Sequence, residues 1–332
     1  MSNLSKTGRV FITGATGVLG KRVMKSLIEK NIRVVALSRS ASNSSQLTQA
    51  DAEVVVGNLF NAEEMIEATK NCDAIFHLAT HIPRKPIPNK MKDWEENDRI
   101  RTEGTKALLQ AAAANNIKIF IQESVTILYG NKNGEAVTSE TPIAEEQIRW
   151  TRSAVEMENM IRNEKRTGHI ILRFGSFYSE DSWNTTYLFD SVRKRQFPII
   201  GKGDFYWNLI SVDDAADAVV YSYQNFQRLK NKTINFTDFS PILYKDFANG
   251  MAELTGSKKP FSIPLFFAKL LLGKEVIGFI TNSYRIQQDD IISDWKPKYN
   301  NCLEGLASIL QNKKETIHNN IRTAQSLQTS SS

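Results

Sequence analysis

Cysteine is scarce in this chain of 332 residues, which contains only two. Cys72 and Cys302 lie far apart and do not show the spacing of metal ligands. Two separate thiols of this kind are typical of a reduced, cytoplasmic protein. We therefore predict no metal site and a cytoplasmic location.

A long hydrophobic run is also absent. The most apolar stretch, Phe261–Ile280, is interrupted by Pro264, Lys269, Gly273, Lys274, Glu275 and Gly278. No clean run approaches the ~20 residues that a membrane span needs. Residues Met1–Arg9 are polar and lack the apolar core of a signal peptide. We expect no membrane partner, and we interpret Phe261–Ile280 as helices that cover a second lobe and line an apolar substrate pocket.

The chain has no basic stripe with interleaved aromatic residues. Its formal net charge is +6, but lysine and arginine are scattered along the sequence. Nucleic acid is therefore a poor candidate partner, whereas a small anionic ligand suits the charge. A hydrophobic content of 41% and a charged content of 23% are those of an ordinary soluble globule.

A glycine-rich segment, Thr13–Gly20, directly follows the apolar run Val10–Ile12. Gly14 permits a tight turn, Gly17 lets the backbone approach a pyrophosphate, and Gly20 lets a helix pack closely on the strand. The N–H groups at the start of that helix would face the phosphates. This pattern predicts a dinucleotide site; the alternative is a glycine turn without a ligand.

The surroundings of the glycines support the dinucleotide interpretation. Apolar residues at helical spacing predict a helix over Gly17–Glu29, and Ile32–Leu37 follows as a buried strand. Together these segments form the strand–helix–strand unit that the motif requires.

Arg39 follows the second strand, where an NAD site usually places a carboxylate. Its guanidinium can pair with a 2′-phosphate, and Ser38 and Ser40 can donate hydrogen bonds to the same group. We therefore predict NADP in preference to NAD. The alternative is a solvated arginine at a strand end.

Strands and helices alternate through the first half of the chain. This order predicts an α/β fold of the Rossmann type, a doubly wound parallel sheet with a smaller C-terminal α+β substrate lobe. The predicted strands are Val10–Ile12, Ile32–Leu37, Glu53–Val56, Asp73–Leu78, Ile117–Ile121 and His169–Leu172. The predicted helices between them are Gly17–Glu29, Ala62–Lys70, Lys92–Asn115 and Glu145–Glu164.

The pattern becomes looser after Arg173. We predict a dinucleotide-binding domain over 1–175, a mainly substrate-binding lobe over 176–323 with segments that return to the sheet, and a disordered tail over 324–332. Asp213 lies in the first turn of a predicted helix, and we interpret it as a cap or a contact between lobes. Thr233–Phe236 is predicted as a strand, and Tyr244–Thr255 as a helix.

Several motifs together resemble the extended short-chain dehydrogenase/reductase superfamily, which includes nucleotide-sugar epimerases and dehydratases. They are Thr13–Gly20, Asp73–Thr80, Gly104-Thr105, Leu172–Tyr178, Val212–Ala215 and Trp295–Pro297. The resemblance covers about Arg9 to Leu306, and it implies contacts of Asn58 with the adenine. The cofactor-binding residues that we predict are Thr13, Gly14, Thr16, Gly17, Val18, Leu19, Gly20, Ser38, Arg39, Asn58, Leu59, Leu78, Ala79 and Thr80.

The catalytic tyrosine and lysine of that superfamily are missing. Counting back from Glu158 places Trp150 at the tyrosine position and Ala154 at the lysine position. Counting from Glu156 gives Ile148 and Arg152 instead, and the superfamily's asparagine falls on Arg101. The chain therefore resembles an atypical, epimerase/dehydratase-like subgroup with a rebuilt site.

Five residues near predicted strand ends are candidates for the missing chemistry. Ser124 and Tyr129 follow the fifth strand, and Glu123 could act as a base if burial raised its pKa. Tyr178 and His81 follow the sixth and fourth strands. For Glu123 the alternative is pairing with Arg99 or Arg101, for His81 a structural role in its loop, and for Tyr178 packing beneath the substrate lobe.

Two main functions remain open at this point. The first is an NADP-dependent oxidoreductase that acts on a small organic substrate with a nonstandard proton donor. The second is a non-catalytic NADP-binding regulator or scaffold, and a lesser one is a lyase, isomerase or cyclase without net redox chemistry. The second lobe favours an enzyme. The resemblance also implies a homodimer through the helices near Lys92–Asn115 and Glu145–Glu164.

Overall fold

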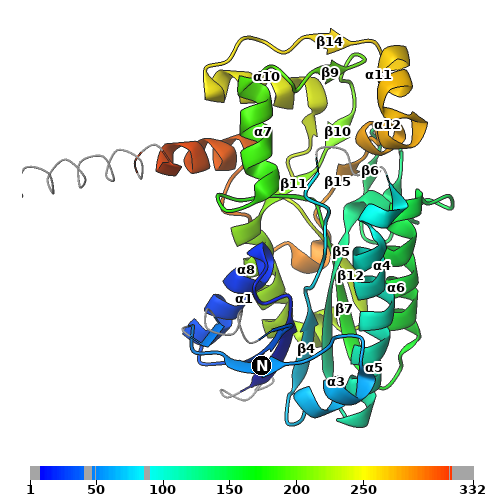
Figure 1. Cartoon of the computed structure of the whole chain (residues 1–332), viewed down its shortest axis with the longest axis vertical. Helices are drawn as coiled ribbons and strands as arrows, with labels where there is room; N and C mark the ends of the chain where they lie inside the picture. The colour runs from blue at the N-terminus through cyan, green and yellow to red at the C-terminus, as the bar shows by residue number, and fades with distance from the viewer. Residues whose placement is uncertain (1–7, 41–46, 49, 86–89, 314, 316–332) are drawn as a thin grey trace, which may run out of the picture.

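The computed structural model describes residues 8–40, 47–48, 50–85, 90–313 and 315. Its centre is a seven-stranded sheet of order β12-β7-β5-β4-β1-β2-β3, in which all pairings are parallel (Figure 1). The strands are β1 Arg9–Thr13, β2 Arg33–Ser38, β3 Glu53–Val56, β4 Ala74–His77, β5 Ile119–Val125, β7 Gly168–Phe174 and β12 Lys232–Phe236. The predicted parallel Rossmann sheet is confirmed.

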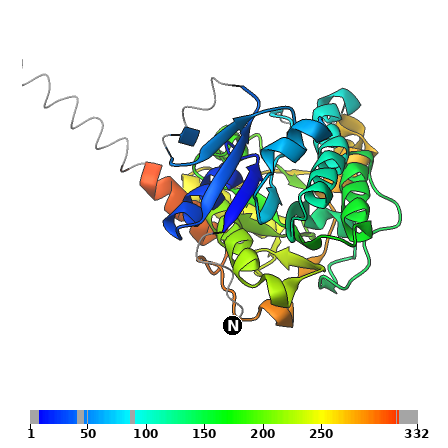
Figure 2. The same ribbon diagram turned by 90° about the horizontal axis from the view of Figure 1, so that it is seen from below.

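Helices cover both faces of the sheet, because its strands carry apolar residues on both sides. Val10 and Ile12 pack against α1 Val18–Glu29 and α8 Val212–Gln224. Phe11 points to the other face, which α3 Ala62–Ala68, α5 Thr105–Ala114 and α6 Arg152–Asn163 cover. Figure 2 shows these two helical layers on opposite sides of the strands.

Two of the predicted helices differ in the structure. The helix expected over Lys92–Asn115 is divided into a 3-10 turn Met91–Asp93, α4 Glu95–Arg99, a π-helical turn Ile100–Gly104, and α5. The helix expected over Glu145–Glu164 becomes α-helical only at Arg152, because the Gln147 side chain donates to the carbonyl oxygens of Leu128 and Ala144 and holds a non-helical segment.

The second lobe is built from short elements above the sheet (Figure 1). Its helices are α7 Trp183–Arg193, α10 Tyr244–Thr255, α11 Leu265–Leu272, α12 Lys274–Ile280 and a helix over 302–313. Its paired strands are β8 Ser176–Tyr178 with β11 Leu209–Ser211, β9 Ile199–Ile200 with β14 Ser262–Ile263, β10 Tyr206–Trp207 with β13 Ile242–Leu243, and β6 Ala136–Val137 with β15 Arg285–Ile286. The lobe has its own apolar core around Phe247 and Met251.

Some predictions lie at the edges of what the structure describes. The tail predicted over 324–332 lies outside the described residues. No helix in the described ranges combines the length and the apolarity that crossing a bilayer requires. After residue 175, α8 packs on the sheet and β12 extends it; these are segments of the kind predicted to return to the sheet.

The connection between β1 and α1 has room only for glycine at two positions. Gly14 has φ +77°, and a Cβ there would lie 2.7 Å from the Cα of Ala79. A Cβ on Gly20 would lie 2.1 Å from the carbonyl oxygen of Gly14. Real Cβ atoms do not approach backbone this closely, so α1 can pack on the bend only when residue 20 has no side chain.

Replacing Gly20 with alanine should therefore force α1 away from the bend. We expect Gly20→Ala to lower the free energy of unfolding by about 3 kcal/mol, measured by urea denaturation. Gly278→Ala is the matched control, because Gly278 lies in α12 with nothing within 4 Å of its Cβ position. Equal stability of the two variants would show that the contact between bend and helix does not contribute to stability.

Candidate functional site

The N-terminus of α1 presents unpartnered backbone donors. Gly17 is its N-cap residue and provides no side-chain cap. Among the described residues, the N–H groups of Val18, Leu19 and Gly20 have no hydrogen-bond acceptor. A helix end of this kind attracts anions, because unpaired N–H groups and the helix dipole both favour negative charge. The bend and the helix end together fit a dinucleotide pyrophosphate, and the side chain of Thr16 is exposed beside them.

The ends of β1 and β4 are joined below the bend. Thr13 Oγ1 lies 2.7 Å from His77 Nδ1, and His77 Nε2 lies 3.2 Å from the carbonyl oxygen of Ile100. Burial lowers the pKa of His77 to about 4, so this imidazole is neutral and structural. After β4 the chain places Ala79 against Gly14, with Leu78 buried and Thr80 exposed.

At the other end of the predicted cofactor site, Arg39 is exposed and lies 3.8 Å from the carboxylate of Glu96. Ser38 is buried, and its hydroxyl donates to the carbonyl oxygen of Ser40 at 2.8 Å. Sequence reasoning did not find Glu96, which reaches this edge from α4. A carboxylate therefore lies near the position where Arg39 was predicted to receive a phosphate.

The next loop also has defined partners. Asn58 Oδ1 accepts a hydrogen bond from the N–H of Phe60 at 3.1 Å, which fixes the turn after β3. Leu59 is buried against Gly104, whose Cβ position would lie 2.9 Å from Leu59 Cδ2.

Ser124 belongs to a buried ionic network. Its hydroxyl donates to Glu158 Oε1 at 2.7 Å, and Arg173 donates to the same carboxylate through Nε at 2.9 Å and Nη2 at 2.6 Å. Arg162 adds a further bond at 2.5 Å. Burial raises the pKa of Glu158, but these arginines outweigh it and hold that pKa below its ordinary value. This arrangement ties α6 to β5 and β7.

The two candidate tyrosines lie in the interior. Tyr129 donates its hydroxyl hydrogen to Asn235 Oδ1 at 2.9 Å beneath the guanidinium of Arg173. Tyr178 lies in the core of the second lobe, where its hydroxyl crowds Gly305. Burial raises the pKa of both hydroxyls.

His81 lies on the surface after β4. Its side chain is exposed, and its backbone N–H donates to Asn97 Oδ1 at 2.9 Å.

Glu123 is different, because its carboxylate has no hydrogen-bond partner in the part of the chain that the structure describes. It is 6% exposed and lies near the carboxyl end of β5. By alternation it shares the strand face of Ile119 and Ile121, which is the face that α1 covers. Burial raises the pKa of Glu123 to about 7, against the opposing positive charge of Arg101. A carboxyl group in this state can donate or accept a proton near neutral pH.

Three buried polar side chains near this end of the sheet carry atoms without partners among the described residues. They are Asn97 Nδ2, Arg101 Nε and Gln122 Oε1. Arg101 lies in the π-helical turn, and its Nη1 is 3.5 Å from the carbonyl oxygen of Trp150. Unsatisfied buried groups are costly, so each of these atoms needs an ordered water or a polar group of a ligand as its partner. The sequence signal was the arginine at the superfamily's asparagine position.

An aromatic stack occupies the position of the missing tyrosine. Trp150 stacks on Trp94 with centroids 6.2 Å apart and meets the edge of Phe279 from α12 at 5.9 Å. Ala154, one turn further along, is fully buried and has no polar side-chain atom. The second lobe therefore reaches this end of the sheet with an aromatic surface.

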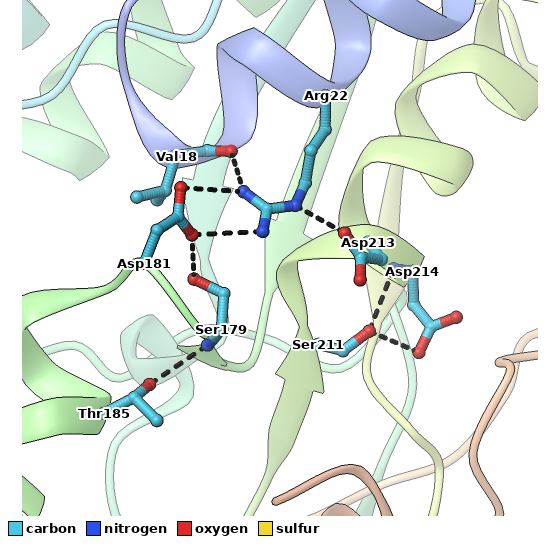
Figure 3. A network of polar contacts seen from close by, with 8 residues as sticks. All are labelled: Val18, Arg22, Ser179, Asp181, Thr185, Ser211, Asp213 and Asp214. Carbon is cyan, nitrogen blue, oxygen red and sulfur yellow. Dashed lines mark hydrogen bonds and ion pairs between the residues drawn. The ribbon is translucent and has the colours of Figure 1, made fainter. Parts of the chain in front are cut away.

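Arg22 joins α1 to the later part of the chain (Figure 3). It bonds to the carbonyl oxygen of Val18 at 2.9 Å, to Asp181 at 3.0 Å, and to Asp213 of α8. The helix cap is Ser211, which accepts from the N–H of Asp214. Asp213 is therefore neither the cap nor a contact between lobes, because its partner Arg22 lies on α1, which packs on the sheet beside α8. Within the described residues, no cluster of His, Cys, Asp and Glu could hold a metal ion.

Comparison with known proteins gives the family. The sequence model of the NAD dependent epimerase/dehydratase family matches residues 10–236. The chain therefore belongs to this family, as its motifs implied, and its fold and relatives support an NAD(P)-binding protein of the oxidoreductase type.

Individual relatives are distant but cover much of the chain. A Streptomyces 3-diazoavenalumate denitrifying reductase is 24% identical and covers 90% of this chain and 99% of its own. A Dictyostelium discoideum decarboxylating sterol-4-alpha-carboxylate 3-dehydrogenase is 24% identical, with coverages of 72% and 74%. A human epimerase family protein solved with NADPH has a TM-score of 0.75 at 16% identity, with coverages of 92% and 99%. MoeE5, solved with UDP-glucose and NAD, has a TM-score of 0.72 at 20% identity and covers 93% of this chain and 100% of its own.

The network around Glu158 can be tested through stability. Glu158→Gln leaves Arg173 buried without a counter-charge, so we expect a loss of about 3 kcal/mol in the free energy of unfolding at pH 7. Because the folded-state pKa of Glu158 is lowered, its contribution is present above the ordinary glutamate range and is lost as pH falls through the folded-state pKa. The control, Glu164→Gln, removes a partner of the exposed Arg166 and should cost less than about 1 kcal/mol. Urea denaturation at several pH values measures both variants. Equal losses of unfolding free energy in Glu158→Gln and Glu164→Gln would contradict the stabilising role of the buried network.

Proposed function

We propose that this chain is an NADP-dependent oxidoreductase of a small organic substrate, in which Glu123 handles the proton in place of the missing tyrosine. The observation that supports this most directly is the Glu123 carboxyl group: buried, without a hydrogen-bond partner among the described residues, and with its pKa raised to about 7. It stands near the carboxyl end of a central parallel strand, where ligands bind in such folds.

The residues around the glycine bend would hold the cofactor. The N–H groups of Val18, Leu19 and Gly20 would receive the pyrophosphate, and Thr16 would add a hydroxyl donor. When bound, a nicotinamide dinucleotide exchanges a hydride with the substrate carbon.

Glu123 then gives or takes the proton that accompanies the hydride. In the reductive direction its protonated carboxyl gives a proton to the substrate oxygen as the carbonyl becomes an alcohol, and water restores the proton afterwards. In the oxidative direction the carboxylate removes the proton of the hydroxyl group. Trp150 and Ala154, at the tyrosine and lysine positions, cannot perform this step, because an indole N–H does not titrate near pH 7 and a methyl group has no ionisable proton.

Arg101 is a positioning residue in this proposal. Its positive charge opposes the rise in the pKa of Glu123 and so keeps the carboxyl within working range. The unpartnered Arg101 Nε, Asn97 Nδ2 and Gln122 Oε1 would receive polar groups of the ligand. In this way a charge from the π-helical turn replaces the lysine that α6 lacks.

The aromatic stack of Trp94, Trp150 and Phe279 favours a substrate with an apolar or aromatic part. The names of a reductase and a dehydrogenase among the relatives agree with redox chemistry.

Arg39 supports a preference for NADP, since it is exposed at the end of β2 and carries the charge that a 2′-phosphate needs. Solved neighbours hold NADPH or NAD, so the family accommodates both.

A second candidate is a dinucleotide-binding protein without turnover. The hydrogen bond of Ser124 to Glu158 and the interior position of Tyr129 favour it, because neither hydroxyl is available to a substrate. Tight NADPH binding without oxidation by any member of a broad carbonyl panel would support this second function and contradict the first.

The role of Glu123 predicts a pH profile. In carbonyl reduction, kcat/KM should be constant in acid and fall about tenfold per pH unit above a pKa of about 7, as the proton donor ionises. Glu123→Gln should lower kcat/KM about 100-fold and abolish this dependence. The control, Glu103→Gln, removes a surface partner of Arg99. Full activity of Glu123→Gln, or an unchanged pH profile, would refute the role.

The proposed preference for NADPH depends on the charge of Arg39, for which Glu96 competes with the 2′-phosphate. Arg39→Asp should weaken NADPH binding about tenfold or more and leave NADH binding nearly unchanged, while Glu96→Gln should strengthen NADPH binding by releasing Arg39 from its partner. Arg33→Asp, at the opposite end of β2, serves as control. Calorimetric titration measures all four proteins. Equal losses for NADPH and NADH in Arg39→Asp would exclude the phosphate contact.

A further inference from the structure

Helix α11 exposes an apolar stripe at the tip of the second lobe. Phe266, Leu270, Phe267 and Leu271 are 72%, 73%, 55% and 72% exposed. Their i, i+1, i+4 and i+5 spacing places them on one side of the helix. Ala268 and Leu272, on the other side, pack on the lobe core. We predicted that this segment lines a substrate pocket; for α11 this is wrong, because its apolar stripe faces outward.

The stripe is large for a soluble surface. Each of its four side chains is more than half exposed. Single exposed apolar side chains are common, but four large ones on one side of a short helix mark a surface that another phase or molecule covers. Figure 1 shows α11 and β14 at the end of the molecule remote from α3 and α5, so this tip can meet a flat surface without obstruction.

The chain segment that contains the stripe carries charge of one sign. Residues 257–274 contain four lysines and no aspartate or glutamate. Lys269 lies on α11 itself, Lys274 begins α12, and Lys258 and Lys259 precede β14. Glu275, the nearest acidic residue in sequence, is paired with Arg149. Lysines beside an apolar helix face complement anionic headgroups above a hydrocarbon layer.

We infer that this tip docks on the surface of an anionic lipid bilayer. In that position the α11 stripe enters the headgroup–acyl boundary, the four lysines contact the headgroups, and the parallel sheet points away from the membrane. The eight residues of α11 are too few to span a bilayer, so the contact is peripheral. The sequence-based expectation of no membrane partner rested on the lack of a spanning run, which such a contact does not need. The inference is independent of the proposed redox function.

Vesicle flotation of the full chain tests this directly. At low salt, we expect binding to vesicles of phosphatidylcholine with phosphatidylglycerol to be about tenfold or more stronger than to phosphatidylcholine alone, and to weaken as salt is added. Phe266→Ser/Leu270→Ser should lower the partition coefficient for anionic vesicles about tenfold or more. Lys258→Glu/Lys259→Glu should remove the preference for anionic lipid.

The control is Val56→Ser/Tyr187→Ser, which removes exposed apolar side chains elsewhere and should float like the wild type. Circular dichroism verifies that each variant is folded. Absence of flotation in the wild type, or equal losses in the control, would overturn the inference. So would a concentration-dependent dimer that Phe266→Ser/Leu270→Ser dissociates without any vesicle binding, because the stripe would then belong to a second copy of the chain.

Discussion

The structure depends on the close contact between a backbone bend and the first turn of α1. If residue 20 had a Cβ atom, that atom would lie only 2.1 Å from the carbonyl oxygen of Gly14. This contact lets α1 begin immediately above β1, and it directs the unpartnered N–H groups of Val18, Leu19 and Gly20 outward. The carboxyl ends of β4 and β5 then lie beside this helix end, which is where the proposed function places the cofactor and the proton donor.

The charged groups near the proposed reaction centre lie on different elements from those of the superfamily. In the superfamily that the chain resembles, a tyrosine and a lysine on one helix handle the proton. Here that helix carries Trp150 and Ala154, while a buried carboxyl on β5 and a buried guanidinium on the π-helical turn stand nearby. Burial moves the pKa of Glu123 toward neutrality, and Arg101 limits the shift. The same physical tuning that activates a tyrosine can thus act on a carboxyl group.

Local signals predicted much of the fold. The glycine spacing, the β-branched strands and the helix over Tyr244–Thr255 follow from short-range preferences, and each is observed. The π-helical turn was not predictable, because no local signal in Ile100–Gly104 distinguishes it from an α-helix. The late start of α6 likewise follows from the side chain of Gln147, whose bonds reach Leu128.

The site was less predictable than the fold, since its contacts join distant segments. Glu96 reaches Arg39 from α4, and Glu158 collects Ser124, Arg162 and Arg173 from three elements. The sequence indicated Glu123, and it offered Arg101 both as a departure from the superfamily and as a possible partner of that carboxylate. Nothing local shows that Glu123 is buried without a hydrogen-bond partner among the described residues. The exposure of α11 is also a tertiary property, because composition alone suggested helices that cover the second lobe and line a substrate pocket.

A crystal structure with NADP bound would test the central claim most directly. The account predicts the pyrophosphate on the N–H groups of Val18, Leu19 and Gly20, and the Glu123 carboxyl as the titratable group nearest to nicotinamide C4. A dinucleotide bound elsewhere, or a different proton donor beside the nicotinamide with Glu123 sealed from it, would contradict the account.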